Sequence, residues 1–371
     1  MERIPVRTAG GDYEVYVGRD ILSSVLPSLL RRLAPRRVAV VSHPEIIELH
    51  GDGLRDILRE AVPGEENTAF FIFPAGEEEK NLGTLEMGYR ALLHADVTRE
   101  DVLLAFGGGV VGDLAGFLAA TYMRGVRYLQ VPTTLMAMVD SSIGGKVGVD
   151  LPEGKNLVGA FHQPRLVVTD PTTLRTLPER ELRAGLVEML KHGLLKADYF
   201  TWYEEHLPEL LACDEEVLTE GIATSCRIKA AVVLADEKER GGPRTLLNLG
   251  HTVGHALENV AGYGVWRHGE AVGIGLIVAG RLSRRLGFLA AEELQRLEKA
   301  VVATLGPYLP RLTRDQLDPL VAALFRDKKT LGGRLRFVLL RRLGEAFVAE
   351  GIEPALVRAE LEGLLEAEVT P

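Results

Sequence analysis

Short runs rich in Val, Ile, Leu and Phe recur along the first half of the chain, separated by stretches long enough for helices. The alternation of apolar runs with helical stretches predicts a parallel α/β sheet with crossover helices. An earlier segment, residues 13–17, alternates apolar and polar positions and predicts a hairpin or an edge strand. The five predicted strands lie at residues 38–41, 70–73, 102–106, 128–131 and 166–169.

The pattern changes after about residue 177, where Pro178 opens a long helical pattern. Stretches rich in Leu, Ala, Glu and Arg follow with few strand signals, at residues 181–196, 215–235, 249–262, 270–286 and 290–304. We therefore expect an α/β N-terminal domain with a mostly parallel, Rossmann-like sheet over residues 1–178, followed by an all-α domain over residues 179–371. One late apolar run, residues 336–340, fits a small strand or a buried helix end equally well.

Composition and charge narrow the range of possible functions. The 371 residues exceed the size at which a single core stops growing, which agrees with two domains. A net charge of -9 and the lack of any run of five basic residues argue against nucleic-acid binding. Every long apolar stretch is interrupted by charge before eighteen residues, and Cys213 and Cys226 have neither a zinc-site spacing nor a disulfide pattern. We expect a cytoplasmic protein that binds neither nucleic acid nor membrane.

A glycine-rich turn follows the predicted strand at 102–106 and precedes a helix. Residues without Cβ let backbone N–H groups approach a pyrophosphate at a helix N-terminus, so the turn is a candidate dinucleotide site. Alone it also fits a ligand-free connection, and its place on about the fourth strand differs from an ordinary Rossmann fingerprint. A nucleotide-triphosphate loop is excluded, because the spacing before Lys155 is wrong and Asn156 replaces the magnesium-binding Ser or Thr. The turn consists of Gly107, Gly108, Gly109, Val110, Val111 and Gly112, followed by Asp113.

Polar residues spaced by glycines fill the segment from Pro132 to Pro164. Their spacing is not helical, and Lys is much rarer than Arg in this chain. The segment therefore predicts a pocket for a phosphate or carboxylate, the alternative being a solvated loop whose lysines face water. The residues concerned are Asp140, Lys146, Lys155 and Asn156.

Histidines concentrate in the helical half. His251 and His255 are spaced i, i+4, so they share one helix face, and His268 follows shortly after. Glu188 lies on an earlier predicted helix. One carboxylate and two imidazoles form a known catalytic zinc set. We expect a metal held by His251 and His255, with His268 or Glu188 completing the set, although a single histidine on an apolar helix is more often a core residue.

Together these stretches resemble the 3-dehydroquinate synthase family from about Pro74 to Arg336. The matching pieces are PAGEEEK at 74–80, GGGVVGDLAGF at 107–117, TYMRG at 121–125, PTTLMAMVDSSIGGKVG at 132–148, GKNLVGAFHQP at 154–164, TLPERELRAGLVEMLKHG at 176–193, DEKERGGPRTLLNLGHTVGHALE at 236–258, HGEAVGIG at 268–275 and RDKK at 326–329. The sequence departs from the family pattern at Met138, Val147 and Asp150, and by one extra residue before Arg244.

The resemblance implies roles for individual residues and an active site in the cleft between the two domains. It implies Glu188, His251 and His268 as ligands of one divalent metal, Zn²⁺ or Co²⁺. For the sugar-acid phosphate substrate it implies Asp140, Lys146, Asn156, Lys191, Lys229, Arg244, Asn248, His255 and one of Lys328 and Lys329, with Arg124 reaching across from the partner subunit of a homodimer. For NAD⁺ it implies Glu77, Lys80, Thr133, Thr134, Lys155 and the turn from Gly107 to Asp113.

The implied reaction is a carbon–oxygen lyase step of the shikimate pathway, which leads to chorismate and the aromatic amino acids. It converts 3-deoxy-D-arabino-heptulosonate 7-phosphate into 3-dehydroquinate and phosphate by transient oxidation with NAD⁺, phosphate elimination, re-reduction and intramolecular aldol closure. The alternatives are a related sugar-phosphate cyclase that makes a valiolone or an inosose, and a metal-dependent polyol dehydrogenase. A third alternative is a non-catalytic homologue that binds nucleotide or metal.

Overall fold

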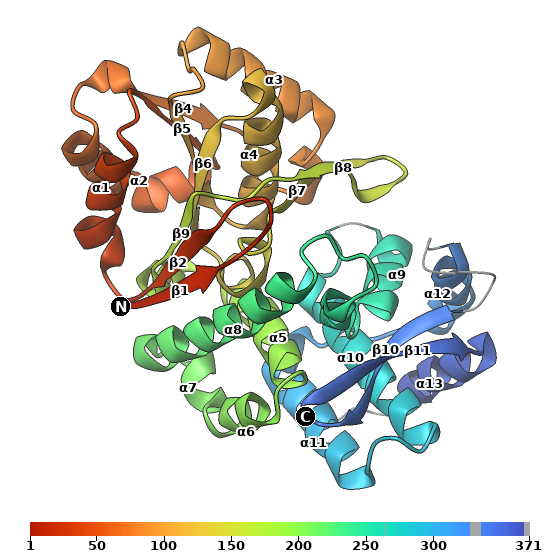
Figure 1. The fold of residues 1–371 in the computed structure, drawn as a ribbon. Helices are drawn as coiled ribbons and strands as arrows, with labels where there is room; N and C mark the ends of the chain where they lie inside the picture. Colours follow the sequence, from red (N-terminus) through yellow and green to blue (C-terminus); the bar gives the residue numbers. More distant parts are fainter. Residues whose placement is uncertain (263, 327–334, 367–371) are drawn as a thin grey trace. The chain divides into compact units, whose positions relative to one another are not determined.

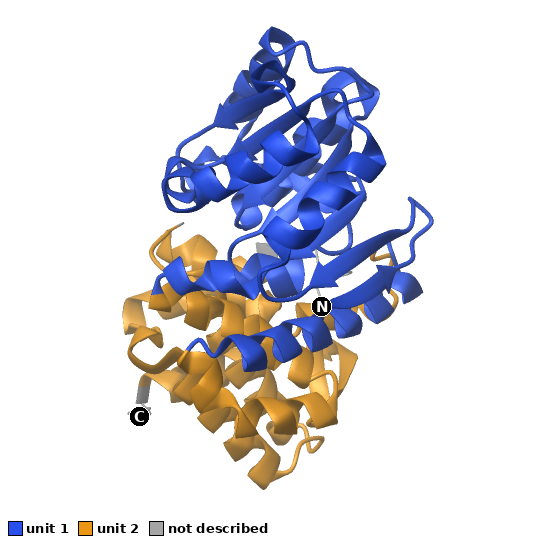
Figure 2. Cartoon of the chain, turned by 90° about the vertical axis from the view of Figure 1, so that its left-hand side faces the viewer, with its two compact units in different colours: residues 1–178, 213–238 blue, residues 179–212, 239–371 orange. Residues whose placement is uncertain are grey.

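The computed structural model describes residues 1–262, 264–326 and 335–366. The chain forms two compact units, shown in blue and orange in Figure 2. Unit 1 contains residues 1–178 and 213–238, and unit 2 contains residues 179–212 and 239–371. The end of the first segment coincides with the predicted boundary, whereas residues 213–238, which we assigned to the second domain, belong to unit 1. The physical reason is that the helix in this segment packs against the first two strands of the sheet.

Unit 1 is built on a seven-stranded sheet with the order β1-β2-β9-β6-β5-β3-β4. Only β1 and β2 pair antiparallel; all other neighbours in this sheet are parallel. The predicted strands and the mostly parallel arrangement are therefore confirmed. The strands are β1 Glu2–Val6, β2 Tyr13–Val17, β3 Val38–Ser42, β4 Thr68–Ile72, β5 Val102–Gly107, β6 Arg127–Pro132 and β9 Leu166–Thr169.

Helices cover both faces of this sheet (Figure 1). Because side chains alternate along a strand, Val38 and Val40 of β3 pack on one face with α1 and α2, whereas Ala39 and Val41 pack on the other with α3 and α4. Burial on both faces explains why the inner strands β3, β5 and β9 are continuously apolar. The helices of unit 1 are α1 Ile21–Leu33, α2 Pro44–Ala61, α3 Leu82–His94, α4 Gly109–Thr121 and α8 Glu215–Ala235.

The glycine-spaced segment contains structure that its composition did not predict. It begins with a π-helix, Ala137–Ser141, and continues as an antiparallel hairpin of β7 Lys146–Leu151 and β8 Gly154–Phe161. Gly148 and Gly159 face each other across this hairpin, and a Cβ on either would meet the opposite backbone. The glycines thus allow two strands to approach closely.

Unit 2 is mainly helical, as predicted. Its described helices are α5 Glu179–Gly193, α6 Ala197–Glu205, α7 Leu207–Leu211, α9 His251–Ala261, α10 His268–Arg285, α11 Ala291–Leu305, α12 Arg314–Arg326 and α13 Pro354–Glu366. It also contains an antiparallel hairpin, β10 Leu335–Arg342 and β11 Glu345–Ile352, so the late apolar run is a strand and this domain is not purely α-helical. In the part of the chain that the structure describes, no helix combines the length and apolarity needed to span a bilayer.

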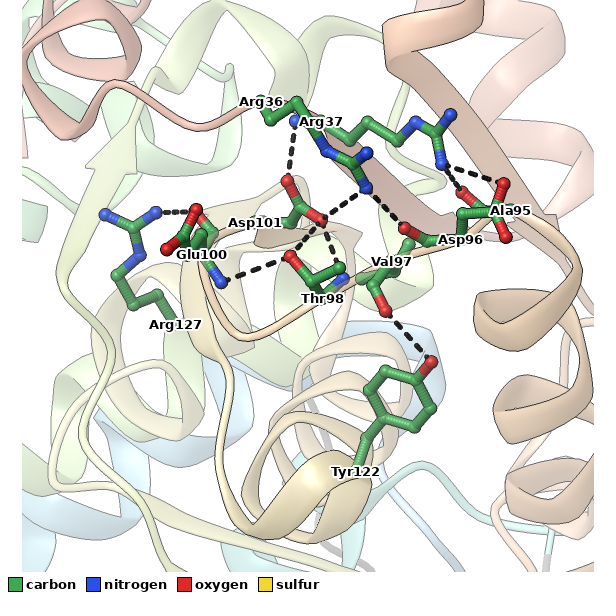
Figure 3. A network of polar contacts seen from close by, with 10 residues as sticks. All are labelled: Arg36, Arg37, Ala95, Asp96, Val97, Thr98, Glu100, Asp101, Tyr122 and Arg127. Atoms are coloured by element: carbon green, nitrogen blue, oxygen red, sulfur yellow. Dashed lines mark hydrogen bonds and ion pairs between the residues drawn. The ribbon is translucent and has the colours of Figure 1, made fainter.

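A polar network joins the amino ends of the strands in unit 1 (Figure 3). Asp101 is fully buried directly before β5, and its carboxylate accepts hydrogen bonds from the backbone N–H of Arg37 at 2.8 Å and of Thr98 at 2.6 Å. Arg127, at the start of β6, donates to the carbonyl of Leu33 at 2.8 Å. Parallel strands place their amino ends on one edge, so this network holds the edge opposite to the glycine turn.

Candidate functional site

The glycine turn lies at the carboxyl end of β5 and leads directly into α4, which begins at Gly109. The chain runs from β3 outward to β4 and then returns to β5 on the other side of β3, so the strand order reverses beside this turn. Ligands of open α/β sheets bind outside such a reversal. This turn follows the fifth strand of the chain, because β1 precedes the strands that we predicted.

The turn is closely packed. A Cβ on Gly112 would lie 2.7 Å from Oε1 of Gln130, and one on Gly108 would lie 3.0 Å from the side chain of Thr134. The backbone N–H of Thr133 donates to the carbonyl of Gly107 at 3.0 Å, which joins the ends of β5 and β6. The first turn of α4 thus presents N–H groups at a helix start where Gly108, Gly109 and Gly112 have no side chain, a feature that suits the diphosphate of a dinucleotide.

Lys80 is the centre of a charged cluster beside this turn. Its side chain is 4% exposed, and its Nζ lies 2.8 Å from Oδ2 of Asp113 and 2.6 Å from Oδ1 of Asn156. Glu77 is 3.7 Å from the same Nζ and 3.5 Å from Nζ of Lys155. Burial acts to lower the pKa of Lys80, but the carboxylates of Asp113 and Glu77 outweigh it and raise the pKa. Lys80 is therefore a fixed ammonium within the predicted NAD⁺ cluster.

A second pair joins Lys229 of α8 to Asp140 in the π-helix. Nζ of Lys229 lies 2.7 Å from Oδ1 of Asp140 and donates to the backbone carbonyl of the same residue at 2.5 Å. The wider turn of a π-helix presents both oxygens on one side, and such distortions are frequent at functional sites. Two predicted substrate residues that are 89 positions apart are thus in contact.

The remaining predicted residues of unit 1 are more exposed. Lys146 is exposed at the start of β7, and Asn156 adopts a left-handed backbone conformation with φ 55°. Arg124 is exposed with φ 64°, directly after Met123 with φ 48°. Two consecutive left-handed residues are costly for side chains with a Cβ, so the backbone there is strained.

Unit 2 brings the predicted metal ligands together. Glu188 of α5 is fully buried, and its Oε1 lies 3.8 Å from Nε2 of His251 and 3.7 Å from Nε2 of His268. The donor atoms of His251, His255 and His268 also lie within 4.8 Å of one another. Four candidate ligands thus share one place, contributed by the helices α5, α9 and α10.

Glycines let these three helices approach. A Cβ on Gly254 of α9 would lie 3.2 Å from the Cα of Val272 in α10. A Cβ on Gly269 of α10 would collide with the backbone of Ala184 in α5, and one on Gly275 would collide with the carbonyl of Gly250. Because the three backbones lie so close together, the carboxylate of Glu188 lies beside the two imidazoles of His251 and His268.

The electrostatics of this cluster suit a cation. Burial lowers the pKa of His251 well below its ordinary value. Burial acts to lower the pKa of His268 as well, but the hydrogen bond to Glu258 and the charges of Glu258 and Glu188 raise it. Glu188 is also paired with Lys191, which is 1% exposed. A neutral imidazole and a buried carboxylate within 4 Å of each other are the donors that Zn²⁺ and Co²⁺ accept, so these residues fit such an ion.

The other predicted residues of unit 2 flank this cluster in the sequence. Arg244 is buried, and Asn248 donates through Nδ2 to Oε1 of Glu239 at 2.6 Å. Our sequence reasoning assigned no role to Glu239 or to Glu258. A signal for Glu258 existed, because it follows His251 at i+7 and His255 at i+3 on one helix face, whereas Glu239 lies in a loop without periodicity.

The predicted residues thus fall into two groups, a nucleotide and substrate group in unit 1 and a metal and substrate group in unit 2. Their assembly into one active site stays a prediction. Lys328 and Lys329 lie outside the described residues.

Known proteins resemble this chain over nearly its whole length. The model of the 3-dehydroquinate synthase N-terminal domain matches residues 70–184, and that of the 3-dehydroquinate synthase C-terminal domain matches residues 185–330. A 3-dehydroquinate synthase from Nitrosospira multiformis is 46% identical over 93% of this chain and 93% of its own. One from Azotobacter vinelandii is 45% identical over 98% of this chain and 97% of its own.

A solved structure shares the fold. The 2-epi-5-epi-valiolone synthase from Streptomyces hygroscopicus, with NAD⁺ and Zn²⁺ bound, has a TM-score of 0.87 and 28% identity. The alignment covers 97% of this chain and 98% of that one. The sequence identity to this valiolone synthase is thus lower than the identity to the two relatives above.

Proposed function

The chain belongs to the 3-dehydroquinate synthase family, and we propose that its residues carry out the family's reaction with a nucleotide site in unit 1 and a metal site in unit 2. The reaction converts 3-deoxy-D-arabino-heptulosonate 7-phosphate into 3-dehydroquinate and phosphate. The observation that carries the residue assignment is the position of Oε1 of Glu188, within 4 Å of Nε2 of both His251 and His268.

We assign the metal to Glu188, His251 and His268, and NAD⁺ to the turn from Gly107 to Asp113 with Glu77, Lys80, Thr133, Thr134 and Lys155. When bound, the metal ion would supply Lewis acidity and NAD⁺ a reversible hydride acceptor, so that the net reaction is a lyase reaction. The helix N-terminus at Gly109 favours the negative charge of the diphosphate. The ammonium of Lys80 neutralises the charge of the nearby carboxylate of Asp113.

The substrate's phosphate and carboxylate require fixed cations and amides. Lys229 is held by Oδ1 and by the backbone carbonyl of Asp140, so it is a hydrogen-bond donor in a fixed position. Lys146, Asn156, Arg244 and His255 are our candidates for the phosphate, because a dianion in a partly closed pocket needs charge-assisted hydrogen bonds. Asn248 is oriented by Glu239, and Lys191 by Glu188.

Three features distinguish the synthase from the alternatives. The valiolone and inosose cyclases share the fold, but Asn248 and His255 here have the residue types that the resemblance implies for the synthase. A polyol dehydrogenase would not need the cationic and amide residues assigned to phosphate. Each residue assigned to the metal or the phosphate is also present, which argues against a non-catalytic homologue.

The protein is further proposed to act as a cytoplasmic homodimer in which Arg124 reaches the site of the partner. Supporting this, Arg124 is exposed and held in a left-handed conformation, and Met123 beside it is 39% exposed. Strained backbone of this kind clusters at functional sites.

The function is tested by mixing the protein with Zn²⁺, NAD⁺ and the heptulosonate phosphate while inorganic phosphate and NADH absorbance are followed together. Release of phosphate without net NADH is the expected result. Sedoheptulose 7-phosphate and glucose 6-phosphate serve as controls. Faster phosphate release from either would assign a cyclase of the other kind, and steady accumulation of NADH would assign a dehydrogenase.

A further inference from the structure

We propose that Glu258 is a positioning residue that fixes the tautomer and orientation of His268 and thereby raises the affinity of the metal site. The inference rests on the proposed function, since it takes Glu188, His251 and His268 as the ligands. Glu258 lies on α9 and is 4% exposed, and its Oε2 lies 3.2 Å from Nδ1 of His268.

The hydrogen bond decides which nitrogen of His268 carries the proton. An ionised carboxylate only accepts hydrogen bonds, so Nδ1 of His268 donates, and in the neutral imidazole that binds a metal Nε2 keeps a lone pair. That Nε2 is the atom 3.7 Å from Oε1 of Glu188. The contact to Glu258 therefore leaves the nitrogen that faces Glu188 ready to ligate.

His251 is held in the same way by a different group. Its Nδ1 lies 3.1 Å from the backbone carbonyl of Leu249, which also only accepts, and its Nε2 lies 3.8 Å from the same Oε1 of Glu188. Both imidazoles thus present Nε2 to one carboxylate, and both have Nδ1 held from behind. A partner behind each ligand is the arrangement that orients imidazoles in metal sites.

The two partners differ in charge and in mobility. The carbonyl of Leu249 is neutral and fixed by the backbone, whereas Glu258 supplies a full negative charge from a side chain. A carboxylate partner raises the basicity of the imidazole and makes it a stronger metal ligand. Loss of such a partner typically lowers metal affinity by about 10- to 100-fold. Glu258 can reach His268 because Gly254 lets α9, which carries Glu258, lie against α10, which carries His268.

The test compares Glu258→Ala, Glu258→Gln and a matched control, Glu360→Gln. Glu360 is also a buried glutamate of unit 2, 8% exposed, but it pairs with Arg285 away from the histidines. The dissociation constant of Zn²⁺ from the full-length protein is measured by competition with a chromophoric chelator. We expect an increase of about 10- to 100-fold for Glu258→Ala, a smaller one for Glu258→Gln, which keeps an acceptor, and none for Glu360→Gln.

A second readout separates positioning from packing. In protein labelled with ¹⁵N-histidine and kept free of metal, the two-bond ¹⁵N–¹H spectrum should show the Nδ1–H tautomer of His268, assigned with His268→Gln. Glu258→Ala should lose this preference. If the wild-type protein binds Zn²⁺ and both Glu258 variants keep its Zn²⁺ affinity and its His268 tautomer, the inference is overturned. If the wild-type protein bound no Zn²⁺, the proposed metal site itself would be wrong.

Discussion

The Nζ atom of Lys80 lies 2.8 Å from Oδ2 of Asp113, the residue that closes the glycine turn. Because Lys80 is buried among three carboxylates, its removal leaves negative charges together without a cation. We expect Lys80→Met to lower the free energy of unfolding by about 3–5 kcal/mol and to weaken NAD⁺ binding. Urea denaturation and calorimetric titration with NAD⁺ measure the two effects. Lys299→Met, at an exposed lysine, is the control, and equal values for both variants would contradict the assigned role.

The identity of the third metal ligand can be decided between Glu188 and His255. Oε1 of Glu188 lies within 4 Å of Nε2 of both His251 and His268, whereas the donor atoms of the three histidines lie within 4.8 Å of one another. We expect Glu188→Gln to lose bound metal, whereas His255→Gln keeps it and loses activity. Metal content after dialysis, measured by mass spectrometry of the eluted ion, checks this. Metal loss confined to His255→Gln would exchange the two roles.

Asp101 is predicted to stabilise unit 1 without affecting chemistry. Its buried carboxylate accepts hydrogen bonds from the backbone N–H groups of Arg37 and Thr98 and from Oγ1 of Thr98. Replacement with Ala leaves these donors without their acceptor, so we expect the free energy of unfolding to fall by about 2–4 kcal/mol. Below the transition, kcat and KM should stay at wild-type values. A changed KM would show that the network at the amino ends of the strands reaches the site.

One buried and one half-buried histidine, His43 and His162, should make unit 1 less stable in mild acid. Burial lowers the pKa of His43 and of His162 below the ordinary value of about 6.5. The unfolded chain therefore binds protons first, so the stability that these residues contribute is present above pH of about 6.5 and is lost as the pH falls below it. Each residue adds a slope of at most about 1.4 kcal/mol per pH unit.

The variant His43→Asn/His162→Gln tests this dependence. His43 contacts the carbonyl of Phe73 through Nδ1 at 3.0 Å, and His162 contacts the carbonyl of Val126 through Nε2 at 3.0 Å. Asn and Gln offer amide donors at similar positions without titrating. Urea midpoints between pH 7 and pH 5 should fall less steeply in the double variant than in the wild type, and parallel slopes would refute the assignment.

The family and most of the candidate site were accessible from the sequence, because the motifs that indicate them depend on local order. The glycine turn must follow a strand and precede a helix, and the spacing of His251 and His255 places them on one helix face whatever surrounds them. Apolar runs likewise marked β3, β5, β6 and β9, since a strand buried on both faces has to be apolar throughout.

Long-range pairing was decided only by the tertiary structure. The period of α8 indicates a helix, but its membership of unit 1 follows from contacts with β1 and β2. The sequence did not predict the hairpin of β7 and β8, because glycines generally weaken a strand. In this hairpin they are required, since the two backbones approach closely. Glu258 became meaningful only when Gly254 allowed α9 to lie against α10. Sequence thus determined the residue types and their local spacing, whereas the partner of each charge depends on which distant backbones approach, which no local pattern encodes.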